Sequence, residues 1–161
     1  GMIMPRIPLF ASLVLASLSA SHLAQAETPA PADPGAEEAF LKILPQVEVP
    51  EDVQPIPGAV NVEFKHCEAF WPPEYRAKAQ TGVEGRAYRD IYSLIRARNV
   101  IETEDCGCSG KAAPWDQVEE VASALRDQHH ATELLWQHTK SIHERGRKLV
   151  AIAETMCGGR F

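Results

Sequence analysis

Two cysteines separated by one glycine, Cys106 and Cys108, are the residues whose type and spacing most directly suggest chemistry. Such a pair can supply halves of two structural disulfides, a redox-active pair, or thiolate ligands for a metal. The chain has two further cysteines, Cys67 and Cys157. An even number in an exported protein favours disulfides, and four cysteines allow three pairings. Structural bridging is therefore the interpretation that we favour.

The two alternatives need specific surroundings. A disulfide between Cys106 and Cys108 would close a small, strained ring that is easily reduced, so thiol–disulfide exchange is one hypothesis. The acidic flank at residues 102–105 disfavours a thiolate, and no C-x-x-C motif is present. A metal hypothesis takes His66, Cys67, Cys106 and Cys108 as soft donors for zinc or copper(I), although their spacing matches no common zinc motif.

Other catalytic or metal-binding signatures are weak. His129 and Glu133 are four residues apart and could share a helix face, but the sequence has neither the pair of E-x-x-H motifs of a di-iron bundle nor an H-E-x-x-H motif. A nucleophile elbow, a Walker loop and a Rossmann fingerprint are also missing from the sequence. We therefore expect a non-enzymatic protein that needs no cofactor.

The first 26 residues predict a signal peptide. Gly1 precedes Met2 and is typical of an expression scar. Arg6 supplies a positive charge, residues 7–20 form an apolar run too short for a comfortable membrane span, and Ala24 with Ala26 forms an A-x-A pattern. We expect cleavage after Ala26 and a periplasmic or secreted mature chain, with an uncleaved membrane anchor as the alternative.

Charge and hydropathy limit the partners. The 161 residues carry a formal charge of −6. An acidic chain is a poor binder of nucleic acid or of an anionic membrane, since both favour positive charge. No later segment is apolar for long enough to cross a bilayer. We therefore expect the partners to be other envelope proteins, or a second copy of this chain.

Residues 27–58 contain seven prolines and predict an extended arm or linker. A short helix is expected near residues 36–44, where Phe40 and Leu44 must either pack on the domain or contact a partner. We expect residues 59–161 to form one helical domain. Tyr75, Tyr88, Tyr92 and the three tryptophans are expected in or beside its core.

The domain should be mainly α. Residues 73–80 and 84–98 predict helix, with a break favoured at Gly82. Residues 114–156 contain no proline after Pro114 and repeat apolar residues every seven positions, which predicts one helix of about 65 Å. Gly146 in this run indicates either close approach of another helix or a kink. Residues 60–66 and 99–104 could form a short β-ribbon.

Helix length bears on the disulfides. Bonded cysteines have Cα atoms within about 7 Å, so a straight helix keeps Cys157 away from Cys106 and Cys108. An antiparallel helical hairpin or small bundle would then favour Cys67–Cys157. The competing arrangement bends the helix, so that Cys67 bonds one member of the C-G-C motif and Cys157 the other.

Phe70 and Trp71 are further candidate interaction residues. They form an aromatic pair that could anchor a partner protein if exposed.

One resemblance adds to these interpretations. The segment "KHCEAFWPPEYRAKAQTGVEGRAYRDIYSLIRARNVIETEDCGCSGKAAPWDQV", with the signal peptide and a C-terminal cysteine, resembles small exported proteins encoded with conjugal-transfer type IV secretion systems. The resemblance covers about residues 60–157. It implies a periplasmic accessory role in a conjugation or secretion apparatus and identifies no catalytic residues.

Overall fold

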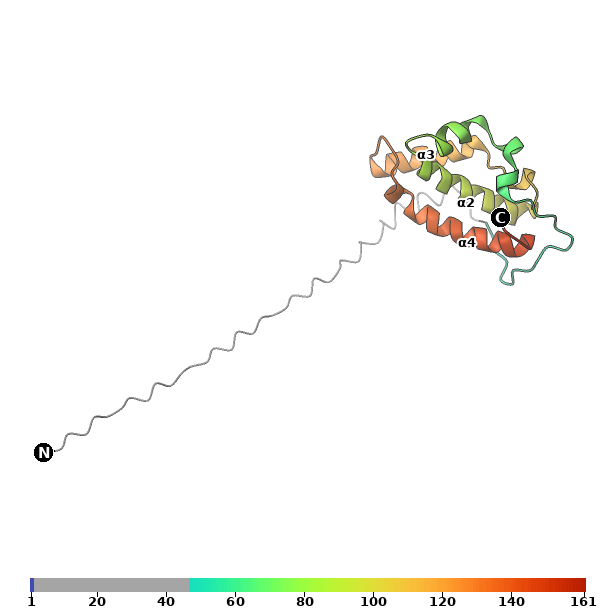
Figure 1. Cartoon of the computed structure of the whole chain (residues 1–161), viewed down its shortest axis with the longest axis horizontal. Helices are drawn as coiled ribbons and strands as arrows, with labels where there is room; N and C mark the ends of the chain where they lie inside the picture. Colours follow the sequence, from blue (N-terminus) through green and yellow to red (C-terminus); the bar gives the residue numbers. More distant parts are fainter. Residues whose placement is uncertain (2–46) are drawn as a thin grey trace. The chain divides into compact units, whose positions relative to one another are not determined.

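The computed structural model describes Gly1 and residues 47–161, and residues 47–161 form a helical domain (Figure 1). Its three α-helices are α2 (Gly85–Thr103), α3 (Trp115–His129) and α4 (Lys140–Cys157). Three shorter helical segments precede α2: η1 (Phe64–His66), η2 (Glu68–Phe70) and η3 (Tyr75–Gln80). Two more connect the α-helices: η4 (Ser109–Lys111) follows α2, and η5 (Trp136–His138) follows α3. The prediction of a mainly α, disulfide-stabilised domain with a long C-terminal helix is confirmed.

Helix α2 is the centre of the core and contacts both α3 and α4 (Figure 1). Its predicted apolar stripe, Tyr88, Ile91, Tyr92 and Ile95, is at most 1% exposed. These side chains pack with residues of the other two helices, including Val118, Val121, Leu125 and Ile142. The i, i+3, i+4, i+7 spacing therefore identified the face that the domain buries.

The prediction of one helix over residues 114–156 is wrong. Helix α3 ends at His129, and His130 adopts a left-handed conformation with φ +49°. The next helix begins only at Lys140. Both helices contribute to the same core, Val118, Val121 and Leu125 from α3 and Ile142 from α4, so residues 114–156 fold back on the domain and do not form one helix of about 65 Å.

Contacts with α2 and the residue before it explain this break. The backbone N–H of Leu134 donates to the Glu84 carboxylate at 2.6 Å, and the buried Thr139 hydroxyl donates to Asp90 at 3.0 Å. Leu134 is itself only 1% exposed. The loop between α3 and α4 is thus held by bonds that a continuous helix could not make.

Gly146 allows α4 to approach α2 closely, which confirms one of the two interpretations of this residue. A Cβ atom built at Gly146 would lie 3.6 Å from the Leu94 Cα, an ordinary van der Waals distance. A single methyl group therefore fits, whereas a branched side chain does not.

The distance between Gly146 and Leu94 predicts how substitutions at Gly146 change the stability of the domain. We expect Gly146→Ala to raise the free energy of unfolding by up to about 1 kcal/mol, because alanine is the better helix former and its methyl group fits. Gly146→Leu should lower it by about 1–3 kcal/mol through overpacking. Urea denaturation measures both, and an equal loss of stability for the two variants would contradict the helix spacing.

Two shorter predictions had different outcomes. Gly82 separates η3 from α2 as expected, and a Cβ there would lie 2.7 Å from the Lys78 carbonyl oxygen. The possible β-ribbon is not found in residues 47–161. Residues 99–103 continue α2 instead, and Phe64–His66 form η1, where the Phe64 ring packs against Tyr75 and Tyr92.

The disulfides are Cys67–Cys108 and Cys106–Cys157, with Cα–Cα distances of 5.3 and 5.6 Å. The Cys67–Cys157 pairing favoured by a straight helix is therefore wrong. The reversal between α3 and α4 brings Cys157 back to the C-G-C motif, as the competing bent arrangement required. Two disulfides are typical of proteins in an oxidising compartment outside the cytoplasm.

Residues 47–58 of the predicted arm pack on the domain. Val47, Val53 and Ile56 contact the core cluster that contains Cys106 and Cys157. The backbone N–H of Ile56 donates to the Met156 carbonyl at 2.8 Å.

Across the described residues, no helix combines the length and apolar character that a membrane span requires. The predicted signal peptide and the short helix near residues 36–44 lie outside them.

Candidate functional site

The C-G-C motif is part of a tight turn that directs its cysteines to different partners. The Asp105 carboxylate accepts hydrogen bonds from the Gly107 N–H at 2.9 Å and the Ser109 hydroxyl at 2.7 Å. These bonds hold the pKa of Asp105 below its ordinary value. A Cβ at Gly110 would lie 2.0 Å from the Asp105 carbonyl oxygen, so the turn requires glycine there.

The redox hypothesis needs a disulfide between Cys106 and Cys108, and the metal hypothesis needs their free thiolates. In this structure Cys106 and Cys108 belong to separate disulfides, and Cys67 is the partner of Cys108. The soft-donor set of His66 with three cysteines is therefore contradicted, because bonded sulfur atoms cannot act as thiolate ligands. His66 is exposed on η1.

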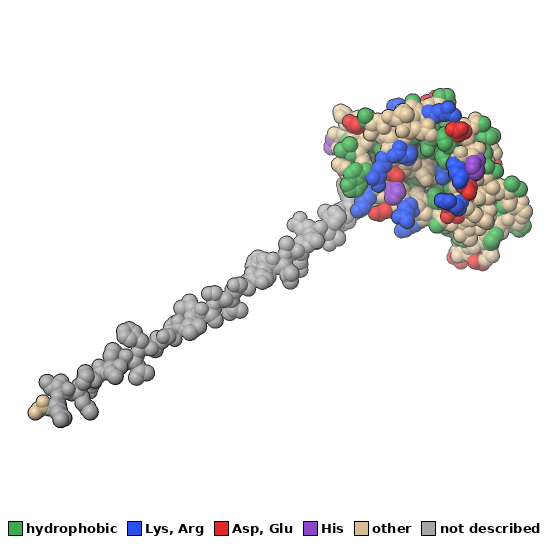
Figure 2. Space-filling model, viewed as in Figure 1, with side chains coloured by type: hydrophobic (Ala, Val, Ile, Leu, Met, Phe, Trp, Pro, Cys, Tyr) green, Lys and Arg blue, Asp and Glu red, His purple; other side chains and the backbone are tan. Residues whose placement is uncertain are grey.

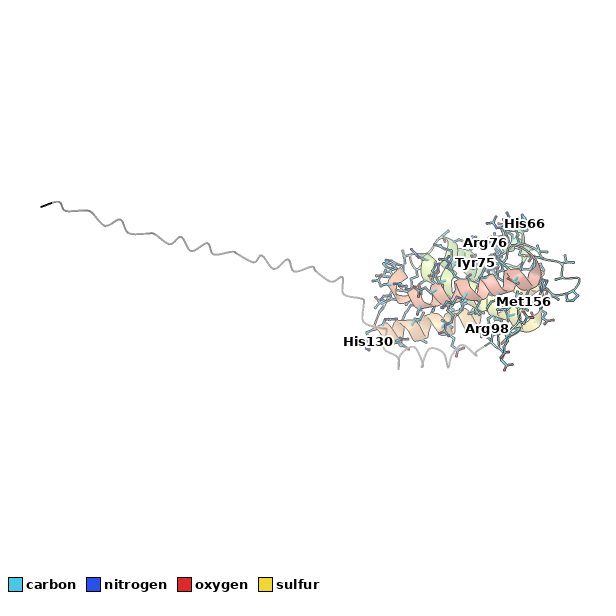
Figure 3. All side chains as sticks on the ribbon, turned by 90° about the horizontal axis from the view of Figure 1, so that it is seen from below. His66, Tyr75, Arg76, Arg98, His130 and Met156 are labelled. Atoms are coloured by element: carbon cyan, nitrogen blue, oxygen red, sulfur yellow. A yellow bond between two sulfur atoms is a disulfide. The ribbon has the colours of Figure 1, made fainter. Side chains whose placement is uncertain are left out.

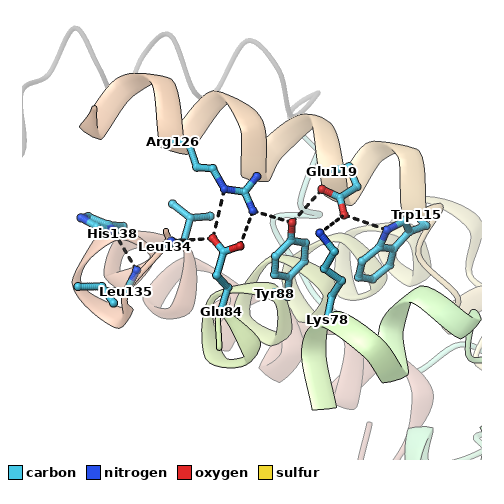
Figure 4. Close-up of polar contacts among 9 residues, drawn as sticks. All are labelled: Lys78, Glu84, Tyr88, Trp115, Glu119, Arg126, Leu134, Leu135 and His138. Atoms are coloured by element: carbon cyan, nitrogen blue, oxygen red, sulfur yellow. Dashed lines mark hydrogen bonds and ion pairs between the residues drawn. The ribbon is translucent and has the colours of Figure 1, made fainter. Parts of the chain in front are cut away.

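A second polar cluster fixes the opposite end of the domain (Figure 4). Glu84 accepts hydrogen bonds from Arg126 at 2.7 and 3.2 Å, in addition to the Leu134 N–H. Burial raises the pKa of Glu84, but the bonds from Arg126 and Leu134 outweigh it and hold the pKa below its ordinary value. The same Arg126 donates to the Tyr88 hydroxyl, which donates to Glu119.

The loop held by Glu84, together with the residue before Glu84, presents apolar side chains to solvent. Trp136 is 56% exposed, Leu135 46% and Val83 86%. Val83 precedes Glu84, and Leu135 follows Leu134. The hydrogen bond between Glu84 and Leu134 therefore brings these two segments of the chain together. We call Val83, Leu135 and Trp136 the apolar tip.

Basic and histidine side chains surround the apolar tip. The Arg86 guanidinium lies 5.9 Å from the centre of the Trp136 ring. The His129 and His138 rings are 4.8 Å apart, and burial together with the charge of His138 lowers the pKa of His129. His138 Nδ1 accepts the Leu135 N–H at 2.9 Å. Figure 3 places His130 at this end of the domain, with His66 and Met156 towards the other.

The predicted histidine–carboxylate pair does not form a helical ligand set. Helix α3 ends at His129, so Glu133 lies in the following loop rather than one turn along the same face. Among the described residues, no group of three or more histidine, cysteine, aspartate or glutamate side chains is arranged to hold a metal ion.

The predicted anchor residues are divided between surface and core. Phe70 is 51% exposed, whereas Trp71 packs beside Phe64 and Tyr75 with ring centres 5.2 and 5.4 Å away. Phe40 and Leu44 lie outside the described residues. Trp136 was expected as a core flank of a continuous helix, and its exposure follows from the break that sequence periodicity did not reveal.

Comparison of the chain with protein-family models, with curated proteins and with solved structures found no match. Function must therefore be inferred from the geometry and from the resemblance described for residues 60–157.

Proposed function

We propose that this protein is a non-enzymatic interaction protein of the periplasm, which binds a partner protein through the apolar tip. The observation that carries the proposal is the exposure of Trp136 and Leu135 on a loop held in place by buried groups. Exposed apolar residues that are clustered and rigid are typical of protein-binding surfaces.

The tip suits binding because its shape is set before a partner arrives. Glu84, which is paired with Arg126, holds the loop at Leu134. At the other end of the loop the Thr139 hydroxyl donates a hydrogen bond to Asp90. A preformed loop loses little conformational entropy on binding. Tryptophan and arginine are enriched among the residues that dominate binding energy, and Arg86 lies beside Trp136.

The compartment is part of the same proposal. Two disulfides support export to an oxidising environment. The n-region, apolar run and A-x-A pattern in residues 2–26 support a cleaved signal peptide and hence the periplasm.

The resemblance of residues 60–157 supports a specific setting for this binding, as an accessory component of a conjugal-transfer type IV secretion system. Deletion of the gene from a strain that carries the transfer genes should then lower the frequency of plasmid transfer. Full complementation by the wild-type gene is the control. Unchanged transfer in the deletion strain would contradict this role while leaving the binding surface open to its own test.

Binding through the tip can be tested directly. We expect Leu135→Ser/Trp136→Ser to reduce recovery of envelope partners in a pull-down by about tenfold or more, because these side chains supply the contact surface. Val60→Ser is the matched control, since Val60 is 76% exposed but lies outside the tip. Equal recovery with the two variants would exclude the tip as the binding surface.

The same pull-down with Phe70→Ser, and with Phe40→Asp/Leu44→Asp, tests whether the other predicted anchor residues contact a partner.

A further inference from the structure

A hollow of about 500 Å³ lies between α2 and α4, away from the apolar tip. A second hollow of about 240 Å³ adjoins it where η1 and the C-terminal residues meet the same helices. Arg96, on α2, lines both. Figure 2 shows Lys and Arg side chains gathered among carboxylates and histidines on the face that α4 crosses.

Arg96 is held as a flat cation between two aromatic rings. Its guanidinium carbon lies 4.1 Å from the centre of the Phe64 ring and 4.2 Å from that of Phe161. Contacts on both faces of the guanidinium fix its plane and leave only its edge nitrogen atoms for hydrogen bonds. The chain therefore places this cation rigidly at the junction of the two hollows.

The guanidinium lacks a carboxylate partner within the described residues. Its Nη1 atom is buried and has no hydrogen-bond partner there. None of the ion pairs among residues 47–161 includes Arg96. Arg96 is half-buried, and a buried guanidinium nitrogen without a partner is costly, which makes this arrangement unusual for a purely structural residue.

The surroundings have an excess of positive charge. Five basic side chains line the two hollows, Lys65, Arg89, Arg96, Arg147 and Arg160, against three acidic ones, Glu63, Asp90 and Glu154. Asp90 is already bonded to Thr139 and His143, and Glu63 is paired with Lys65 at 2.8 Å.

A buried cation, Lys111, lies close to the half-buried Arg96. Lys111 is fully buried and its ammonium nitrogen lies 4.7 Å from the Phe161 ring centre. Burial, and then the charge of Arg96, lowers the pKa of Lys111 to about 8. Burial likewise lowers the pKa of Arg96 to about 10, so the nearby Tyr75, Tyr92 and Glu154 do not compensate for its desolvation.

We propose that the groove around Arg96 binds a small organic anion through a carboxylate group. A carboxylate presents two oxygen atoms in one plane, which matches the edge of a guanidinium whose faces are covered. Arg147, exposed on α4, supplies a second positive charge on the groove wall. Val150 and Ala151 line the same hollow and suit a short aliphatic body.

The experiment is a titration of the full chain with succinate, followed by NMR at constant ionic strength. We expect saturable shifts of α2 and α4 amides, and affinity about tenfold lower in Arg96→Gln, which loses the charge-assisted bonds. Arg147→Gln should also weaken binding, and because Arg147 is exposed this variant remains informative if Arg96→Gln fails to fold. Arg76→Gln, an exposed arginine of η3 outside the groove, is the matched control and should bind as wild type does.

Three outcomes would overturn the proposal. These are the absence of saturable shifts with succinate, equal weakening by Arg76→Gln and Arg147→Gln, and tight binding of inorganic phosphate without binding of succinate. The Leu135→Ser/Trp136→Ser variant should bind succinate as wild type does, so this test is independent of the proposed function.

Discussion

We expect the double replacement Cys106→Ala/Cys157→Ala to lower the free energy of unfolding by about 4 kcal/mol, the value that chain entropy gives for a loop of this length. The bridge joins residues 51 apart in the chain. Both cysteines are at most 4% exposed and lie in the core cluster with Val100 and Met156. Chemical denaturation of the oxidised wild type and of the variant measures the difference.

The pairing itself can be tested by the choice of double variant. Cys67→Ala/Cys108→Ala should also cost about 4 kcal/mol, since its loop is only slightly shorter. Cys67→Ala/Cys157→Ala removes one cysteine from each bridge, so it should destabilise the domain more than either matched pair. If Cys67→Ala/Cys157→Ala were the mildest of the three, the observed pairing would be wrong. Thiol titration under denaturing conditions confirms which variants retain a bridge.

The second large effect concerns Glu84. We expect Glu84→Ala to lower the free energy of unfolding by about 3 kcal/mol, because it removes the acceptor of two Arg126 hydrogen bonds and of the Leu134 N–H. Glu120→Ala is the control, since Glu120 is exposed on α3, and it should change stability by less than about 0.5 kcal/mol.

The effect of Glu84 should depend on pH in a defined direction. Its pKa is lower in the folded protein than the ordinary value of 4.5, so the ionised carboxylate stabilises the fold above pH 4.5. That contribution is lost as the pH falls through the folded pKa. The stability difference between wild type and Glu84→Ala should therefore shrink on acidification, and a difference that grew below pH 4 would contradict the role of the charge.

The sequence was sufficient to predict the helical class and the buried face of α2. Tyr88, Ile91, Tyr92 and Ile95 repeat at helical spacing, and this local pattern agrees with the final packing. Gly82 likewise marked a helix boundary, because its position near the Lys78 carbonyl excludes any larger residue.

The break between α3 and α4 could not be predicted in the same way. The seven-residue repeat continues through Leu135 to Ile142, yet Leu135 is 46% exposed and Ile142 is 1% exposed. Helix α3 ends at His129 without a glycine or proline to stop it, because the stabilising contacts come from Glu84 and Asp90, about fifty residues away in the chain. A pattern within a short window contains no information about such partners.

The candidate sites depend on the same long-range contacts. Trp136 is exposed only because the helix breaks before it. Arg96 lies between Phe64 and Phe161, which are distant in sequence from it and from each other. Cysteine number therefore predicted structural disulfides, whereas the long-helix interpretation favoured the wrong pairing and did not predict the exposed surfaces.

The order of the disulfide partners has a consequence for biogenesis. Along the chain the first cysteine bonds the third and the second bonds the fourth, so the two loops interleave. A chain oxidised in the order in which its cysteines leave the translocation channel would first join Cys67 to Cys106. That non-native bond must be exchanged before Cys157 can find its partner, and the neighbouring Cys108 thiol is placed two residues away to attack it. Maturation of this protein should therefore depend on disulfide isomerisation and not on oxidation alone.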